Sequence, residues 1–218
     1  MFLHYAFDEW MVREHRLVLF ERYCDDVIVH ARSEQHARDL RAAIASRLAE
    51  RGLELNEQKT RIVYCKDDQR RGSSEHTSFD FLGYTLRPRL SRRKHGGQFV
   101  NFLPAASDDA RKRIRREIRG WRLHLRPGKT ISDLARIFNP IIRGWINYYG
   151  RFYKSMLYPL LRRINEHLVR WAMRKYKRLR RREKRAGELM AEASRRSPQL
   201  FAHWRIGLKP DGWTMGAG

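Results

Sequence analysis

Two adjacent aspartates, Asp25 and Asp26, are the residues of this sequence best suited to chemistry. Apolar segments at residues 17–20 and 27–29 flank them, which predicts a strand, a tight turn and a second strand. Carboxylates on a rigid hairpin can bind Mg²⁺, and nucleotidyl transfer uses two such ions about 4 Å apart to activate a 3′-hydroxyl and stabilise pyrophosphate. Aspartate is also common in hairpin turns, so turn formation alone remains an alternative.

Charge is distributed unevenly along the 218 residues, whose net charge is +23. Residues 1–100 carry a net charge of +3, whereas residues 101–218 carry +20. A field of this strength attracts polyanions, so the second half predicts nucleic acid as a partner. Because an anionic membrane or a ribosomal environment would satisfy charge equally well, charge indicates the class of partner and not the reaction.

The composition excludes several classes of protein. Hydrophobic residues make up 42% of the chain and aromatic residues 11%, which is enough for a packed core and excludes wholesale disorder. The mean hydropathy is −0.72, no apolar run approaches the ~20 residues of a membrane span, and we expect no signal segment. With only Cys24 and Cys65, neither a disulfide scaffold nor a Cys-rich zinc module is expected. We expect two reduced, buried thiols in a cytoplasmic protein.

The first half of the chain reads as helices mixed with strands. Leu3, Phe7, Trp10 and Met11 have helical spacing, and Ser33 is suited to cap a second helix. We expect helices at 3–14 and from Ser33 to Gly52, an extended segment at 53–65, a polar loop at 66–78, and strands at 79–87 and 98–103, the last preceded by a turn at Gly96-Gly97.

The second half reads as helices only. Ser107 is suited to cap a helix with a stripe of Ile114, Ile118, Trp121 and Leu125. We expect this helix to end at Pro127-Gly128, a second at about 132–151 that is bent or broken at Asn139-Pro140, a third at about 159–185, and a short aromatic segment from about 195. The predicted fold class is therefore α+β: a partial antiparallel sheet with helices, followed by an all-helical basic region.

Four ordered motifs resemble the reverse transcriptases encoded by group II introns. Tyr23-Cys24-Asp25-Asp26 resembles the active-site hairpin of reverse transcriptases, although the family usually has Ala where this chain has Cys24. Three later segments are also similar to the family. The next palm segment is matched by residues 52–62, the primer grip by residues 79–84, and the maturase-specific region by residues 138–150. The resemblance implies RNA-directed DNA polymerisation and assistance of intron splicing.

The resemblance also implies roles for individual residues. Asp25 would be a ligand of the catalytic Mg²⁺ ions, Asp26 a supporting acid, and Lys59 a general acid for pyrophosphate, although a solvated lysine is an equal alternative. The primer grip would consist of Phe81, Leu82, Gly83 and Tyr84. Alternating aromatic residues in a strand usually belong to a core, so Gly83 is the most suggestive of the four because it permits close approach of the backbone.

RNA-contacting residues are implied in the second half. Arg143 is the best candidate, whereas Trp145, Tyr148 and Tyr149 could equally form one buried face of a helix. Residues 174–185 contain nine basic residues in twelve, which on a single helix would be basic almost all round and would repel each other without a polyanion. The candidates in this run are Arg174, Lys175, Lys177, Arg178, Arg180, Arg181 and Arg182.

A two-metal polymerase site needs a further aspartate, which in the family lies well upstream of the hairpin. We therefore expect the chain to correspond to the C-terminal part of such a protein: the end of the palm at 1–104, a thumb and maturase-specific region at 105–190, and a short tail at 191–218. Expected partners are structured intron RNA, RNA/DNA hybrid and a separately encoded N-terminal half. The alternative is a non-enzymatic, maturase-like RNA-binding protein or a degenerate intron remnant.

Overall fold

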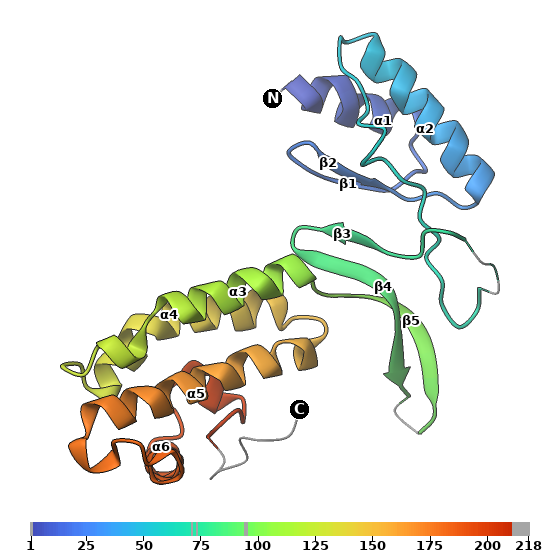
Figure 1. The fold of residues 1–218 in the computed structure, drawn as a ribbon. Helices are drawn as coiled ribbons and strands as arrows, with labels where there is room; N and C mark the ends of the chain where they lie inside the picture. The colour runs from blue at the N-terminus through green and yellow to red at the C-terminus, as the bar shows by residue number, and fades with distance from the viewer. Residues whose placement is uncertain (1, 71, 73, 94–95, 211–218) are drawn as a thin grey trace. The chain divides into compact units, whose positions relative to one another are not determined.

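A computed structural model describes residues 2–70, 72, 74–93 and 96–210. Helices and two small sheets confirm the predicted α+β class (Figure 1). Contacts divide the chain into a hairpin unit, Met1–Phe81 with Arg87–Phe102, and a helical unit, Leu82–Leu86 with Leu103–Gly218. None of the helices in the described ranges is both long and apolar enough to cross a membrane.

The hairpin unit is built on two helices. A π-helical turn at His4–Asp8 continues into α1 (Glu9–Glu14), and α2 spans Glu34–Ala49. The hydroxyl of Ser33 accepts a hydrogen bond from the His36 N–H, and Gly52 has a left-handed φ of 69° after the helix, so both predicted ends are confirmed. The core of the unit contains Phe7, Met11, Ile44 and Leu48.

Strands β1 (Phe20–Tyr23) and β2 (Asp26–Val29) form an antiparallel hairpin whose pairs run from Phe20↔Val29 to Tyr23↔Asp26. The prediction of a strand at 17–20 was wrong in position, because the turn at 24–25 fixes the register and β2 provides partners for 20–23. Leu17 and Leu19 are instead 81% and 73% exposed.

The expected extended segment at 53–65 forms no strand. Leu53 and Leu55 pack against the core of the hairpin unit, and Asn56 begins a turn by accepting the N–H groups of Lys59 and Thr60. The turn at Asn56 interrupts the extended backbone, and farther along the Tyr64 N–H donates to the His76 carbonyl at 2.8 Å outside any strand. Residues 71 and 73 of the polar loop predicted at 66–78 lie outside the described residues.

The second sheet has the strand order β3-β4-β5, with β3 at Phe79–Phe81, β4 at Tyr84–Arg92 and β5 at Gln98–Ala106. The single strand predicted at 79–87 was wrong, because Leu82 and Gly83 have left-handed φ values of 49° and 78° and turn the chain between β3 and β4. The predicted turn at Gly96-Gly97 is confirmed, with φ values of 93° and 84°. Short connections of this kind join antiparallel neighbours.

The helical unit packs its helices around one core, to which α3 (Asp108–Gly120), α4 (Ile131–Tyr149) and α5 (Tyr158–Lys175) contribute. Ser107 caps α3 as predicted, and Thr130 with Asp133 forms a capping box on α4. The helix α3 ends at Gly120 and not at Pro127, because Arg122 is left-handed (φ 45°). Short 3-10 turns follow at Leu123–Leu125, Lys154–Met156 and Lys177–Leu179.

We predicted a bend or a break at Asn139-Pro140. Pro140 lies inside α4, which is continuous from Ile131 to Tyr149, so the break was wrong. Proline removes one backbone donor from a helix. Leu134 and Phe138 before the proline and Ile142 after it all pack into the core, so residues on both sides of Pro140 are buried. Burial of this apolar face outweighs the local preference of proline for a helix end.

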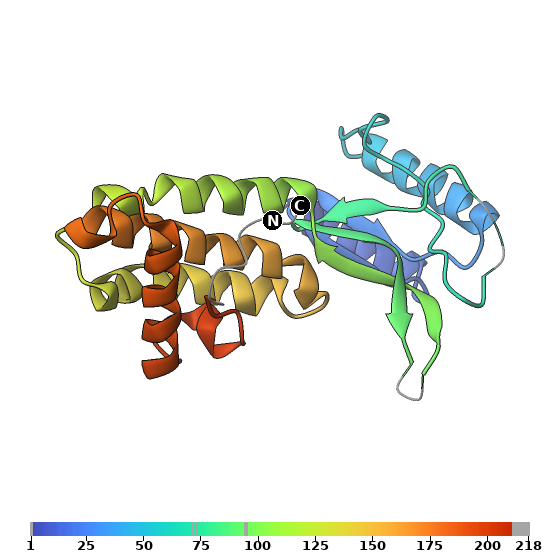
Figure 2. The same ribbon diagram turned by 60° about the horizontal axis from the view of Figure 1, so that its bottom comes forward.

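The single helix predicted at 159–185 is two helices, because α5 ends at Lys175 and α6 spans Glu183–Arg196. Between them Arg181 has a left-handed φ of 59°. The helix α6 crosses the other helices of its unit in Figure 2 and packs on α5. The buried face of α5 is the predicted one: Leu161, Ile164, Leu168 and Trp171.

The segment after α6 contributes to the core of the helical unit. His203 and Trp204 of helix α7 (Ala202–Arg205) are buried, as is Phe201 just before it. The Asn139 side chain donates to the Leu200 carbonyl and accepts from the Ala202 N–H, both at 2.8 Å. The Asn165 Oδ1 lies 2.8 Å from His203 Nε2 and 2.9 Å from Trp204 Nε1. Residues 211–218 of the predicted tail lie outside the described residues, and the domain bounds at 104 and 190 stay a prediction.

Candidate functional site

The acidic pair lies at the tip of the β1–β2 hairpin. The pair Tyr23↔Asp26 closes a two-residue turn made of Cys24 and Asp25. Both aspartates are exposed, as is Cys24, so the expectation of a buried thiol at Cys24 was wrong. Cys24 has a left-handed φ of 56°, which a two-residue hairpin turn requires at its first position and which a side chain disfavours. The hairpin therefore presents two carboxylates to solvent from a strained turn.

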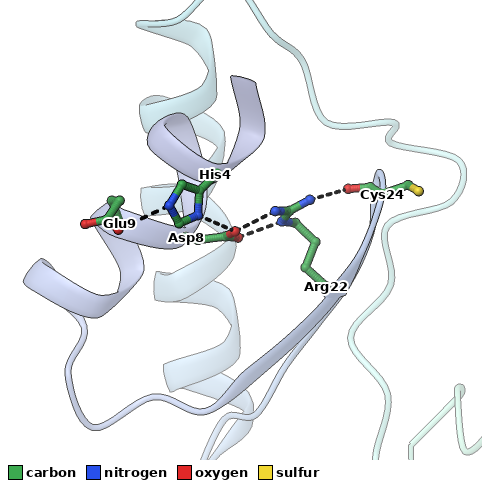
Figure 3. Close-up of polar contacts among 5 residues, drawn as sticks. All are labelled: His4, Asp8, Glu9, Arg22 and Cys24. Atoms are coloured by element: carbon green, nitrogen blue, oxygen red, sulfur yellow. Dashed lines mark hydrogen bonds and ion pairs between the residues drawn. The ribbon is translucent and has the colours of Figure 1, made fainter. Parts of the chain in front are cut away.

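An ion pair lies beside this turn (Figure 3). The Arg22 guanidinium donates from Nε to Asp8 Oδ1 at 2.6 Å and from Nη2 to Asp8 Oδ2 at 2.5 Å, and its Nη1 donates to the Cys24 carbonyl at 2.8 Å. Both side chains are about four-fifths buried. The hydrogen bonds from Arg22 lower the pKa of the Asp8 carboxyl, against the opposing effect of burial. Sequence reasoning missed this pair, because fourteen residues separate its members.

Lys59 lies in the turn that Asn56 begins, not in a strand. Its side chain is exposed, and its N–H donates to the Asn56 carbonyl at 3.0 Å and to Asn56 Oδ1 at 3.1 Å. Cys65, the second cysteine, is half-buried, and burial raises the pKa of its thiol. The role of Lys59 as a general acid stays a prediction.

The turn at Leu82-Gly83 is held by residues of the helical unit. The Tyr148 hydroxyl donates to the Leu82 carbonyl at 2.8 Å, and the Ser107 N–H donates to the Gly83 carbonyl at 2.9 Å. A Cβ at Gly83 would lie 3.0 Å from the Tyr149 hydroxyl. The left-handed φ and this close contact together explain why the position is glycine.

Tyr84, the residue after this turn, is buried against aromatic side chains of α4 and its C-terminal extension. Its ring centroid lies 5.2 Å from Tyr148, 5.5 Å from Tyr149 and 5.6 Å from Phe152. Its hydroxyl donates to the Tyr148 carbonyl, and burial raises the pKa of that hydroxyl. Tyr148 and Tyr149 therefore contact the turn that the sequence marked as a primer grip. Phe81, the last residue of β3, is half-buried.

Arg143 and Trp145 differ in exposure although they are close in sequence. Arg143 is exposed on α4, as a nucleic-acid contact requires. The ring of Trp145 stacks on Trp121 with centroids 5.6 Å apart and an interplanar angle of 6°, and it packs against the core of the helical unit. Trp145 therefore packs as part of a buried helix face, the alternative to RNA contact that its spacing left open.

The basic run at 174–185 is a bent segment and not one helix. It includes the end of α5, the 3-10 turn at Lys177–Leu179, and the start of α6. The Lys175 ammonium donates to the carbonyls of Pro127 and Lys129 at 2.8 and 2.9 Å and lies 5.6 Å from the Trp171 ring centre. Its exposed basic residues are Arg174, Lys177, Arg178, Arg180, Arg181, Arg182, Lys184 and Arg185.

Comparison with known families matches two segments of the chain. Residues 1–86 match the reverse transcriptase (RNA-dependent DNA polymerase) family, and residues 111–187 match the group II intron, maturase-specific domain. The chain belongs to the group II intron reverse transcriptase/maturase family. A comparison with curated proteins gave no match.

The two matched segments of this reverse transcriptase/maturase contain different candidate residues. The acidic hairpin and the Leu82-Gly83 turn both lie in the reverse transcriptase match. Tyr148 and Tyr149, which hold that turn, lie in the maturase-specific match, as do Arg143 and the basic run. The helical unit therefore joins a short polymerase segment to the maturase-specific helices.

The expected magnesium ligands suit a hard cation only in part. Asp25 and Asp26 are exposed oxygen donors on a paired hairpin, and Mg²⁺ is often held by one or two carboxylates together with water and substrate phosphates. Within the described ranges, no group of three or more His, Cys, Asp or Glu side chains comes together to hold a metal ion. Asp25 and Asp26 therefore fit part of the ligand set of a magnesium site.

We expect Gly83→Ala to destabilise the helical unit of this maturase by about 1–2 kcal/mol, since a Cβ would both disfavour the left-handed φ and press on the Tyr149 hydroxyl. Gly207→Ala is the matched control, because Gly207 has a φ of 87° in the same unit but open space around its Cβ position. Urea denaturation followed by tryptophan fluorescence measures both. Equal losses in the two variants would show that the Tyr149 contact contributes nothing.

Proposed function

We propose that this chain binds structured intron RNA through its helical unit and contributes Asp25 and Asp26 to the metal site of an RNA-directed DNA polymerase. The family assignment supports the reaction type. The observation that carries the proposal is the hairpin itself, whose tip exposes both carboxylates on a strand pair of fixed register. Exposure is required because these oxygens must reach a metal ion and nucleotide phosphates at the same time.

Magnesium would be held by Asp25, with Asp26 as the supporting acid beside it. When bound, the ion would supply electrostatic stabilisation of phosphate oxygens during nucleotide addition. The protein side chains would supply oxygen ligands, and the Leu82-Gly83 turn would present backbone to a primer strand. A third carboxylate would come from another polypeptide segment, such as a separately encoded N-terminal half.

RNA binding would rest on charge and shape together. Residues 101–218 carry a net charge of +20, and the exposed arginines between α5 and α6 lie in a bent segment. Phosphate contacts of this kind position an RNA without reading its sequence, whereas recognition of a fold depends on shape and unstacked bases. The arginines of the basic run would serve the first role and Arg143 the second.

A polypeptide of these 218 residues is expected not to extend a DNA primer on an RNA template in the presence of Mg²⁺. The physical reason is that two carboxylates leave a two-metal site without its bridging partner, and the described residues bring no third acid to the pair. Primer extension resolved on a denaturing gel tests this, with Asp25→Ala as the control. Robust extension that disappears in Asp25→Ala would show that the site is complete.

The same assay tests whether a second polypeptide can complete the metal site in trans. Adding a polypeptide that carries the fingers and the first palm aspartate of a family member should produce extension that depends on Asp25. Extension that persists in Asp25→Ala would assign catalysis to the added polypeptide alone and would remove Asp25 from the proposed site.

A second candidate function is a non-enzymatic, maturase-like RNA-binding protein or a degenerate intron remnant. The observation that favours it is the absence, within the described ranges, of any cluster of three metal-ligating side chains. This candidate predicts preference for folded intron RNA without any extension in trans. The two functions therefore differ in the trans assay and agree in RNA binding.

A further inference from the structure

The ion pair between Asp8 and Arg22 reaches the backbone of the acidic turn directly. Two nitrogens of the guanidinium bind the Asp8 carboxylate at 2.6 and 2.5 Å, and the third donates to the Cys24 carbonyl at 2.8 Å (Figure 3). His4 Nδ1 lies 3.2 Å from Asp8 Oδ2, the oxygen that also accepts from Arg22 Nη2. One side chain thus connects the helical segment at residues 4–14 to the turn.

The bond to the Cys24 carbonyl constrains the residue that follows. The Cys24 carbonyl and the Asp25 N–H belong to one planar peptide group, so fixing the carbonyl fixes the orientation of the amide that enters Asp25. Cys24 is the left-handed residue of this turn, with a φ of 56°. Non-glycine residues hold such a conformation only when the surrounding structure imposes it. The hydrogen bond from Arg22 to the Cys24 carbonyl is one contact that stabilises this conformation.

The ion pair with Asp8 also engages the positive charge of the Arg22 guanidinium. Arg22 is only three positions from Asp25, and a guanidinium readily pairs with carboxylates through its planar fork. Asp8 takes up both nitrogens of that fork at hydrogen-bonding distance, and both side chains are about four-fifths buried. The carboxylates of Asp25 and Asp26 remain exposed.

We propose that Asp8 and Arg22 are positioning residues for the acidic turn: Arg22 holds the peptide group that enters Asp25, and Asp8 holds Arg22 there and away from the Asp25 and Asp26 carboxylates. The inference rests on the proposed role of Asp25 as a metal ligand. It assigns a positioning function to two residues outside the proposed pair of metal ligands.

Hydrogen exchange of the full chain tests the positioning of the turn. Arg22→Lys keeps the positive charge and can pair with Asp8, but lysine lacks the fork that reaches both Asp8 and Cys24. We expect amides of residues 20–29 to exchange about tenfold faster in Arg22→Lys and in Asp8→Asn, while amides of α2 are unchanged. Glu14→Gln is the matched control, since it removes an acid from α1 whose partner, Arg13, is exposed. Unchanged exchange at residues 20–29 would overturn the positioning role.

Titration with Mn²⁺ alone, followed by line broadening of backbone amides, tests the second role. We expect Asp8→Asn to weaken broadening at residues 24–26 at least threefold relative to Glu14→Gln, an estimate based on a freed guanidinium competing for the carboxylates. The double variant Asp8→Asn with Arg22→Gln removes that competitor. It should recover Mn²⁺ binding while its turn still exchanges fast, a split that simple loss of structure would not produce.

The two proposals fail in different ways. Broadening at residues 24–26 that persists in Asp25→Ala would contradict the proposed metal site, and the exchange data would still decide whether Arg22 holds the turn. Equal Mn²⁺ affinity in Asp8→Asn and Glu14→Gln, with binding lost in Asp25→Ala, would overturn the screening role of Asp8.

Discussion

Replacing Arg178, Arg180, Arg181 and Arg182 together by Gln should flatten the salt dependence of RNA binding by up to roughly three units of slope, because each neutralised phosphate contributes about 0.7 to 0.9. All four side chains are exposed in the bent segment between α5 and α6. At about 0.1 M salt the affinity for any RNA should fall by up to about a thousandfold. Fluorescence anisotropy across a salt series, with group II intron RNA and scrambled RNA side by side, measures both quantities.

A matched control removes the same charge elsewhere in the helical unit. Four arginines there already pair with acids three or four residues away: Arg111, Arg136, Arg195 and Arg196. Their replacement by Gln should change the slope much less, because their charge is partly neutralised within the protein. Similar slopes for the two quadruple variants would show that binding depends on net charge and not on the bent segment.

Arg143→Gln should separate recognition of shape from attraction to phosphate. We expect it to reduce the preference for folded intron RNA over scrambled RNA, with a change in slope of no more than about one unit. Equal affinity of the unmutated chain for the two RNAs would contradict the maturase function, because only a general attraction to polyanions would remain.

The helical unit should lose stability progressively as the pH falls from about 6.5 towards 3. His203 is fully buried, and burial lowers its pKa from 6.5 to about 3. In the unfolded chain the imidazole takes a proton near pH 6.5, whereas the folded protein takes it only near pH 3. The unfolded state therefore binds more protons between these values, and stability falls as the pH falls through this window. The loss approaches about 4 to 5 kcal/mol near pH 3 and is absent above pH 7.

Urea denaturation followed by tryptophan fluorescence at several pH values measures this loss. His203→Gln can still donate to Asn165 and cannot titrate, so its stability should change much less between pH 7 and pH 4. His124→Gln is the control, because His124 is an exposed histidine of the same unit. Burial also lowers the pKa of His167, which leaves a smaller dependence of the same sign. An unchanged pH dependence in His203→Gln would contradict the assignment of a buried neutral imidazole.

Local sequence signals predicted the parts of the fold that depend on neighbours in the chain. Ser33 and Ser107 cap helices as expected, because capping involves residues only three positions apart. Gly96-Gly97 turns the chain as expected for the same reason. The prediction failed where distant packing decides, as at Pro140, whose helix continues because its flanking apolar residues are buried.

The candidate site divides in the same way. Asp25 and Asp26 were identifiable because a turn between apolar segments is a local pattern, and the family motif lies there. The roles of Tyr148 and Tyr149 were not identifiable from spacing alone, because their contacts with Leu82 and Gly83 span more than sixty positions of the sequence. Asp8 was missed for the same reason, since its partner Arg22 lies in a different element.

The Asn139 and Asn165 contacts have a consequence for synthesis on the ribosome. Both asparagines hold backbone or side chains of residues 200–208, and Leu208 belongs to the core. Domains generally fold as units during translation, from the N-terminus onward. The helical unit can complete its core only after residue 208 has been made, so its basic helices emerge while the core is still open. The hairpin of β1 and β2, whose pairs lie within ten consecutive residues, can close much earlier.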